Sequence, residues 1–148
     1  MCKLTSTRTP MDKDLSKRLE YVLVQLFKKR ETEPFREPVD YEAFGLLDYP
    51  NIIKRMMDLG TIRRNLKSDT YKYLESAFED IQLVWDNCKL YNVEDSMIHK
   101  TAVKLEKITE SLLKEQFEDL IDQSKGQLAK RSDEITGLVV ERQEEFYY

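Results

Sequence analysis

Residues 73–91 read "YLESAFEDIQLVWDNCKLY" and are followed by "NVEDS", residues 92–96. The apolar residues of the 73–91 segment recur at spacings of three and four, which predicts a helix with one buried stripe. The stripe holds Leu74, Ala77, Phe78, Ile81, Val84, Trp85, Cys88 and Tyr91. The polar break at 92–95 predicts a short turn, and Asp95 or Ser96 can cap the helix that follows.

Similar periodicity appears on both sides of this stretch. Residues 12–30 and 96–123 predict two more long helices, and residues 58–68 predict a short helix that tolerates Gly60. The predicted fold class is therefore all-α, with the architecture of a four-helix bundle. We expect residues 1–11 to be a flexible leading segment, residues 12–123 to be the folded domain and residues 124–148 to be a C-terminal extension.

Residues 31–57 interrupt the helical pattern. They contain three of the four prolines of the chain, yet they are rich in aromatic and aliphatic residues. Such a segment is too apolar for a disordered linker, and long connections in small domains are usually functional. We therefore expect this loop to pack against the bundle and to shape a surface.

Composition excludes several classes of protein. The 148 residues suit one domain, and no apolar run is long enough for a membrane span or a signal peptide. The net charge of −4 argues against a general nucleic-acid binder, although a basic cluster leaves a secondary contact open. This cluster consists of Lys54, Arg55, Arg63, Arg64 and Lys67.

Residues suited to catalysis or metal binding are few. Cys2, Cys88 and His99 match no metal-ligand spacing, and their scarcity favours a reduced compartment, no metal and no cofactor. His99 is interpreted as a solvated or rim residue near a helix start, and Cys88 as a small core or pocket-wall residue rather than a nucleophile. There is no glycine-rich phosphate loop. The sequence therefore predicts a protein that is not an enzyme.

Binding signals are stronger. If the 31–57 loop and residues 87–98 meet at one end of the bundle, they enclose a small apolar slot that offers one amide and one or two phenols. Such a slot suits a neutral group with a methyl and a carbonyl. Asn92 either contacts that group or merely ends a helix in an unusual backbone conformation, and the pattern leaves both open. Residues 31–50 hold six acids and one base, which fits either a rim for a basic peptide or an ordinary solvated loop.

Three segments, in this order and at these separations, resemble the bromodomain, a module that reads acetyl-lysine. They are "PFREPVD" (34–40), "LDYPNIIKRMMDLGTI" (47–62) and "DNCKLYN" (86–92), the last followed by Ser96. The resemblance implies a left-handed bundle of helices named Z, A, B and C, at 12–30, 58–68, 73–91 and 96–123. It also implies that a long ZA loop and a short BC loop enclose the pocket.

The resemblance implies a role for each candidate site residue. Asn92 donates an amide hydrogen bond to the acetyl carbonyl, and Tyr49 reaches the same oxygen through a water molecule. The walls are formed by Val39, Phe35, Phe44, Leu46, Cys88 and Tyr91, and Ile98 takes the gatekeeper position. Glu33 replaces a common tryptophan, so the rim, which also holds Glu94, should be more open and more acidic.

The implied partners are acetylated lysine peptides, above all histone tails, read in the nucleus by a subunit of a larger chromatin complex. Two further departures from the family pattern are Met56, where a proline is frequent, and Tyr73, where a polar helix cap is usual. The alternative is a helical scaffold whose pocket has lost its function.

Overall fold

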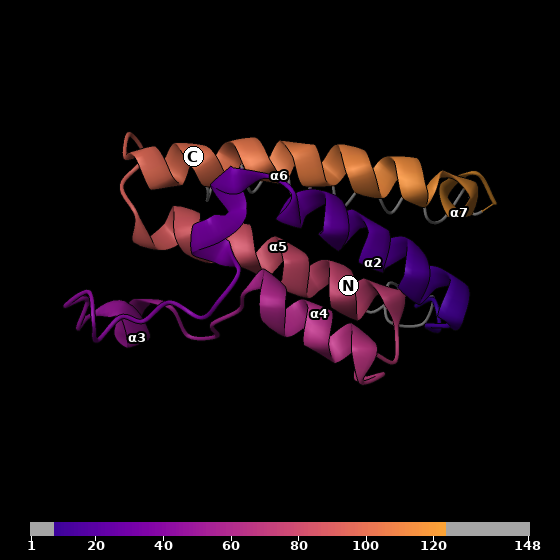
Figure 1. Ribbon diagram of the computed structural model, residues 1–148, viewed down its shortest axis with the longest axis horizontal. Coiled ribbons are helices and arrows are strands. Elements are labelled where there is room, and N and C mark those ends of the chain that lie inside the picture. The colour runs from indigo at the N-terminus through magenta and orange to yellow at the C-terminus, as the bar shows by residue number, and fades with distance from the viewer. Residues whose placement is uncertain (1–7, 124–148) are drawn as a thin grey trace.

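The structure is a computed structural model, which describes residues 8–123 of the 148-residue chain. Four helices form the bundle: α2 (Lys13–Phe27), α4 (Leu59–Lys67), α5 (Leu74–Tyr91) and α6 (Met97–Gln116). The 3-10 helix η1 (Arg30–Phe35) and the short helix α3 (Tyr49–Ile52) lie between α2 and α4, and α7 (Glu118–Gln123) follows α6. Helix α5 packs against α4 and α6, and α2 packs against the same two helices (Figure 1). The prediction of an all-α four-helix bundle is confirmed.

Short polar side chains begin three of these helices. Asp12 accepts a hydrogen bond from the backbone N–H of Leu15 at 2.8 Å, and Asp58 accepts one from Thr61 at 2.8 Å. Ser96 takes the same position before α6 and accepts from the backbone N–H of His99 at 3.3 Å. Each cap satisfies a donor that the first turn of a helix leaves without a partner.

Helix α5 begins in a different way. Its N-cap residue Tyr73 makes no side-chain cap, and the preceding chain supplies the missing partners instead. The backbone N–H of Leu74 donates to the Thr9 carbonyl at 2.8 Å, and the N–H of Met11 donates to the Lys72 carbonyl at 2.9 Å. The expectation of a flexible segment over residues 1–11 is therefore wrong for residues 8–11, which belong to the folded domain.

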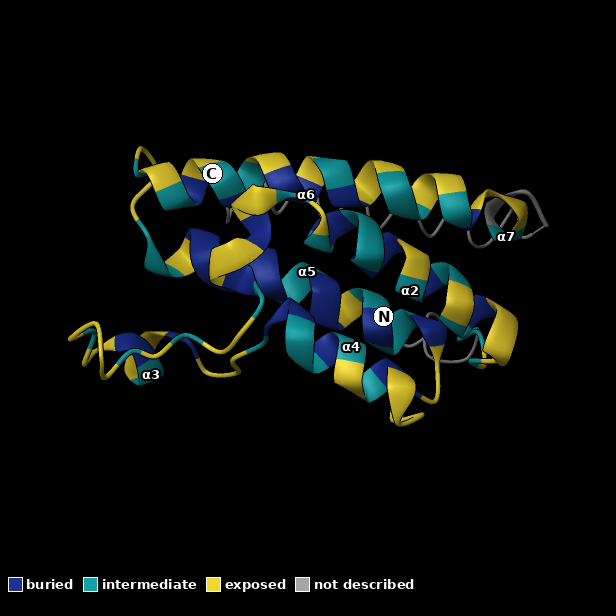
Figure 2. Cartoon of the chain, in the orientation of Figure 1, coloured by how far each residue is buried: buried dark blue, intermediate teal, exposed yellow. Residues whose placement is uncertain are grey.

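The core lies along the inner faces of the four main helices. Trp85 of α5 and Leu23 of α2 are fully buried, as are Ile62 of α4 and Leu105 of α6. Figure 2 shows these buried faces in dark blue turned toward one another. Burial of each large aliphatic side chain contributes about 1.5–3 kcal/mol. The apolar stripe of residues 74–91 therefore holds the bundle together, as its spacing predicts.

The helix predicted over 96–123 is not continuous. Helix α6 ends at Gln116, and Phe117 leaves helical geometry with φ −119° and ψ 24°. The Phe117 ring is buried and lies edge-on to Phe78 at 5.2 Å between ring centroids, with the Arg18 guanidinium 5.9 Å from its centroid. The break thus places an aromatic ring in the core. The predicted extension over 124–148 lies outside the described residues.

Two polar features inside the bundle were not anticipated. Lys89 of α5 and Glu106 of α6 form an ion pair at 2.6 Å, with 0% and 2% of their side chains exposed. Gln82 donates a hydrogen bond to the second carboxylate oxygen of Glu106 at 2.5 Å. His99 is also buried, at 4% exposure, so its interpretation as a solvated residue is wrong. It takes the first position of the inward stripe of α6.

Candidate functional site

The candidate site depends on how the loop over residues 36–58 is attached to the bundle. At its start, the Arg36 guanidinium donates to the hydroxyl of Thr32 at 3.0 Å and to the carbonyl of Phe27 at 2.9 Å. The Arg36 carbonyl in turn accepts from the backbone N–H of Gly60 at 3.1 Å. A Cβ at Gly60 would clash with that carbonyl oxygen, so glycine permits this close approach.

The end of the loop is held by a second polar cluster. The buried Asn87 of α5 donates its amide hydrogen to the carbonyl of Arg55 at 2.8 Å. The Arg55 guanidinium donates to the buried Asp80 at 2.7 Å, and the Tyr71 hydroxyl donates to the other Asp80 oxygen at 2.7 Å. Sequence reasoning missed Asn87, although an asparagine beside the buried Cys88 was a usable signal, because a buried amide needs a partner.

An aromatic cluster joins the loop to the end of α5. The Tyr49 ring is buried, stacks on Tyr41 with centroids 5.9 Å apart and meets Tyr91 edge-on at 4.8 Å. The Tyr91 hydroxyl donates to the Asp48 carboxylate at 2.7 Å. Burial raises the pKa of Tyr49, and the hydrogen bond to Asp48 raises the pKa of Tyr91, so both phenols stay protonated at neutral pH. The structure therefore brings the predicted pair Tyr49 and Tyr91 together and adds Asp48 and Tyr41 to them.

Asn92 ends α5, but its backbone does not require asparagine. Its φ of −98° and ψ of 143° are ordinary extended values, so the alternative of an unusual backbone conformation is wrong. Its amide nitrogen donates to the Cys88 carbonyl at 2.9 Å and approaches the Cys88 sulfur at 3.5 Å. Because an amide nitrogen carries two hydrogens and a thiol is a weak acceptor, one hydrogen holds the amide in place and the other can be given to a ligand.

Cys88 lies beneath this amide. Its side chain is buried, and its sulfur lies 3.5 Å from the carbonyl oxygen of Ile98 at the start of α6. Burial raises the pKa of the thiol to about 11, which disfavours the reactive thiolate. Ile98 is half-buried and packs against the core. Both residues thus lie around Asn92, and Cys88 is an apolar neighbour of the amide rather than a nucleophile.

The remaining predicted wall residues occupy different environments. Val39 and Leu46 are half-buried on the loop. Phe35 is buried in the core, with its ring 5.2 Å from that of Trp85. Phe44 is 72% exposed, so it does not form a wall and its predicted role is corrected to a residue of the rim. A tight turn causes this, because Asp40 accepts from the backbone N–H groups at positions 43 and 44 and leaves the phenylalanine ring outside.

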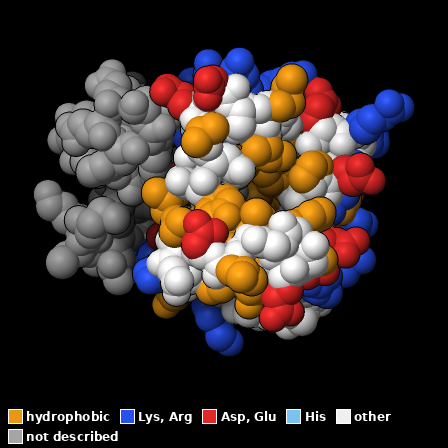
Figure 3. Space-filling view, turned by 90° about the vertical axis from the view of Figure 1, so that its left-hand side faces the viewer, with side chains coloured by type: hydrophobic (Ala, Val, Ile, Leu, Met, Phe, Trp, Pro, Cys, Tyr) orange, Lys and Arg blue, Asp and Glu red, His pale blue; other side chains and the backbone are white. Residues whose placement is uncertain are grey.

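The end of the molecule that carries Asn92 is both apolar and acidic on its surface. Figure 3 views this end directly, and hydrophobic side chains gather near its middle with acidic and basic side chains around them. The predicted rim residues Glu33 and Glu94 are both exposed. A separate hollow of about 480 Å³ lies at the other end of α5, beside Tyr71 and Lys72, and it does not adjoin Asn92.

Metal chemistry and membrane insertion find no support in the described part of the chain. No group of three or more histidine, cysteine, aspartate or glutamate residues there could hold a metal ion. No helix among residues 8–123 has the length and apolar content that crossing a bilayer requires. What the site does offer is an amide, two phenols and aliphatic side chains around them, which together suit a small neutral polar group.

The sequence is similar to those of several known proteins. The family model described as Bromodomain matches residues 19–104. A bromodomain-containing protein of Schizosaccharomyces pombe is 36% identical over 106 residues, which cover 72% of this chain and 15% of that protein. Transcription factor GTE1 of Arabidopsis thaliana is 35% identical over 106 residues, which cover 72% of this chain and 25% of that protein.

A third relative, the SWR1 complex bromodomain subunit bdf1 of Schizosaccharomyces pombe, is 35% identical over 94 residues, which cover 64% of this chain and 16% of that protein. The chain therefore spans a minor part of the length of the relatives it matches. It belongs to the bromodomain family. Members of this family are generally acetyl-lysine readers of chromatin and transcription complexes rather than catalytic domains.

Proposed function

We propose that this domain binds acetylated lysine side chains at the end of the bundle formed by the 36–58 loop and the turn after α5. Asn92 donates to the acetyl carbonyl the amide hydrogen that otherwise faces the weakly accepting Cys88 sulfur, and Tyr49 contacts the same oxygen through a water molecule. Val39, Leu46, Cys88, Tyr91 and Ile98 surround the methyl and the lysine stem, above the ring of Phe35. The observation that carries this proposal is the Asn92 amide, which the Cys88 carbonyl holds at 2.9 Å.

The physical basis of selectivity is the removal of charge. Acetylation converts a strongly hydrated ammonium into a neutral amide, which loses much less hydration energy when it enters an apolar site. The carboxylates named near the proposed site are not buried against it, since Asp48 is exposed and already accepts from Tyr91, and Glu33 and Glu94 are exposed to solvent. An unmodified lysine would therefore enter without a counter-charge and should be rejected.

The proposal extends to where the domain works. The names of two relatives place them in the SWR1 complex and among transcription factors. We propose a similar role for this chain as part of a larger chromatin complex in the nucleus, with acetylated histone tails as ligands. The role requires no cofactor and no catalysis. It involves no membrane, and any contact with nucleic acid would be secondary to it.

Substitution of Asn92 tests the proposal. Asn92→Ala removes the donor, and its extended backbone and half-buried position make the fold tolerant of alanine. We expect acetyl-peptide affinity to fall by at least about tenfold, which corresponds to about 1.4 kcal/mol. Helical content by circular dichroism should stay unchanged. Retained affinity in a folded Asn92→Ala protein would place the carbonyl contact elsewhere.

The alternative function is that of a helical scaffold with a degenerate site, suggested by the unusual Glu33 and by the exposed Phe44. It predicts that no acetylated peptide or small acetamide raises the melting temperature in a saturable way.

A further inference from the structure

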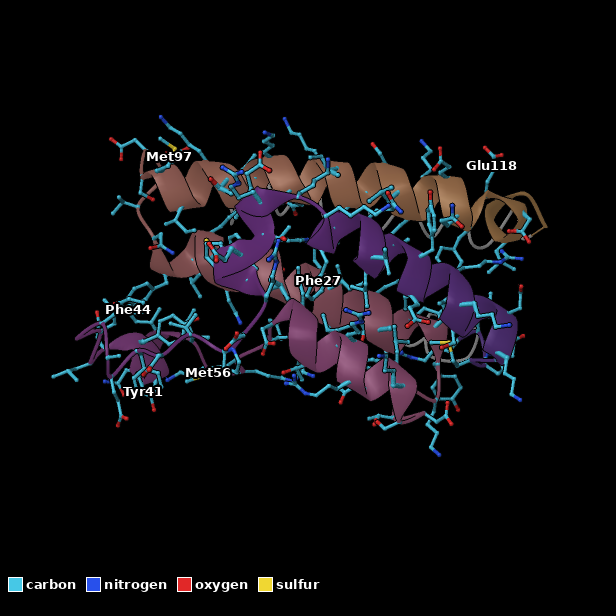
Figure 4. The ribbon with its side chains drawn as sticks, viewed as in Figure 1. Phe27, Tyr41, Phe44, Met56, Met97 and Glu118 are labelled. Atoms are coloured by element: carbon cyan, nitrogen blue, oxygen red, sulfur yellow. The ribbon has the colours of Figure 1, made fainter. Side chains whose placement is uncertain are left out.

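Exposed apolar side chains are concentrated at the end of the molecule that carries Asn92. Nine large hydrophobic residues are exposed within the described chain, and seven of them belong to the 36–58 loop or to residues 90–97. The most exposed are Phe44, Leu47, Val93 and Met97, at 72%, 76%, 70% and 78%. Figure 4 shows Phe44 and Met97 at the same end of the bundle. Such clustering of large apolar side chains marks an interaction surface.

The same end carries a surplus of negative charge. Residues 37–53 and 90–98 together contain six acids, namely Glu37, Asp40, Glu42, Asp48, Glu94 and Asp95, and they contain no lysine, arginine or histidine. Because the whole chain has a net charge of −4, everything outside these two segments sums to +2. All six acids are exposed. This apolar surface therefore lies in a field that attracts cations.

The charge decides which partner this surface fits. A second copy of the chain would bring six acids against six acids, and an anionic lipid surface would be repelled in the same way. A cationic peptide is attracted. The apolar residues also adjoin the proposed acetyl-lysine contacts, since Val93 directly follows Asn92 and Leu47 stands two residues before Tyr49. Residues in an extended peptide advance about 3.3 Å each, so the immediate neighbours of an acetyl-lysine held by Asn92 would be expected beside Val93 and Leu47.

We propose that this mouth, defined as Leu47, Val93 and the six acids above, selects acetyl-lysine that has an apolar residue beside it and arginine or lysine further out. The inference rests on the proposed function and adds a sequence preference to it. The apolar neighbour covers Leu47 and Val93, and the flanking cations face the acids. Covering about 40 Å² of apolar surface raises affinity by about fivefold.

Three short peptides that share one central acetyl-lysine test the inference by calorimetry. The first has only glycine neighbours and no charge, the second has glycine neighbours with outer arginines, and the third has leucine neighbours with outer arginines. The third should bind about fivefold more tightly than the second. Raising the salt concentration should weaken the second and third but not the first.

The double variant Leu47→Ser/Val93→Ser should bring the leucine peptide to the affinity of its glycine counterpart and leave the uncharged peptide within about twofold. Both side chains are exposed, so the melting temperature should not change. Tyr21→Ser, an exposed site on α2, is the matched control and should have no effect.

Equal binding of the leucine and glycine peptides would overturn the inference while leaving acetyl-lysine recognition intact. Failure of all three peptides to bind would overturn both. A concentration-dependent dimer in sedimentation that the double variant abolishes would assign this surface to a second copy of the chain and would also overturn the inference.

Discussion

The buried ion pair between Lys89 and Glu106 gives a sharp prediction about stability. The two charges are 2.6 Å apart with 0% and 2% of their side chains exposed, so each compensates the other for lost hydration. Glu106→Gln keeps the size of the side chain and removes its charge. Lys89 then remains a buried ammonium opposite a neutral amide.

Breaking such a pair on one side costs about 3–5 kcal/mol, which is a large part of the 5–15 kcal/mol that typically stabilises a domain. For a domain of this size we expect the melting temperature to fall by about 12 °C or more. Urea unfolding can be followed by circular dichroism and by the fluorescence of Trp85, the single tryptophan, which is fully buried. The urea concentration at the unfolding midpoint should fall, while the slope of the free energy of unfolding against urea concentration stays constant.

Two further variants complete the experiment. Lys104→Ala breaks an ion pair with Glu31 of similar length, 2.7 Å, but with 61% and 42% of the side chains exposed, and it should cost less than about 1 kcal/mol. The double variant Lys89→Met/Glu106→Leu removes both buried charges and should recover most of the lost stability. If Glu106→Gln cost no more than Lys104→Ala, the reasoning that burial makes this pair interdependent would be refuted.

Three other predictions concern the site and its support. Gly60→Ala should lower the free energy of unfolding by about 1–3 kcal/mol, because the new Cβ meets the Arg36 carbonyl. In a helix without this contact, alanine would instead raise that free energy by about 1 kcal/mol. A higher free energy of unfolding, measured by urea denaturation, would contradict the contact. In a Cys2→Ser background, alkylation of Cys88 at pH 8.5 should be on the order of 50-fold slower in the native protein than in urea. The reason is that burial raises the pKa of its thiol from 9.0 to about 11. Equal alkylation rates would contradict the burial of Cys88. The same shift lowers the free energy of unfolding at high pH, because the thiol ionises more readily in the unfolded chain. The contribution of this thiol to stability is fully present below pH 9.0 and is lost as the pH rises toward 11. Tyr91→Phe should leave the free energy of unfolding within about 1 kcal/mol of the wild-type value, because the hydrogen bond to Asp48 is exposed. It should weaken acetyl-peptide binding a few-fold, because the loop loses this bond to α5. Unchanged binding would show that the bond does not position the loop.

The helices could be predicted because their signals are local and periodic. The apolar stripe of residues 74–91 and the cap Ser96 are readable without any tertiary information. The break at Phe117 was missed because it serves a contact with Phe78, a partner distant in sequence. The uncapped start of α5 was noticed, but its remedy, the pairing with Thr9, depends on a long-range backbone contact.

The site was predictable in its residue types and not in its supporting contacts. Resemblance to a known family supplied Asn92 and Tyr49, whose roles stay a proposal. The resemblance did not supply the hydrogen bond from Tyr91 to Asp48 or the one from Asn87 to the loop. Each is a single contact between residues far apart in sequence, which no local pattern indicates. The resemblance alone placed Phe44 as a wall. Its outward direction follows from the turn at Asp40, which no periodic pattern in the sequence indicates.

The most direct test of the central claim is calorimetric titration of the wild-type protein with two forms of one basic histone-tail peptide, identical except that a single lysine is acetylated in one of them. We expect saturable one-to-one binding of the acetylated form, with an affinity at least about tenfold greater than that of the unmodified form. Equal binding of the two forms, or binding of the unmodified form alone, would contradict acetyl-lysine recognition by this domain.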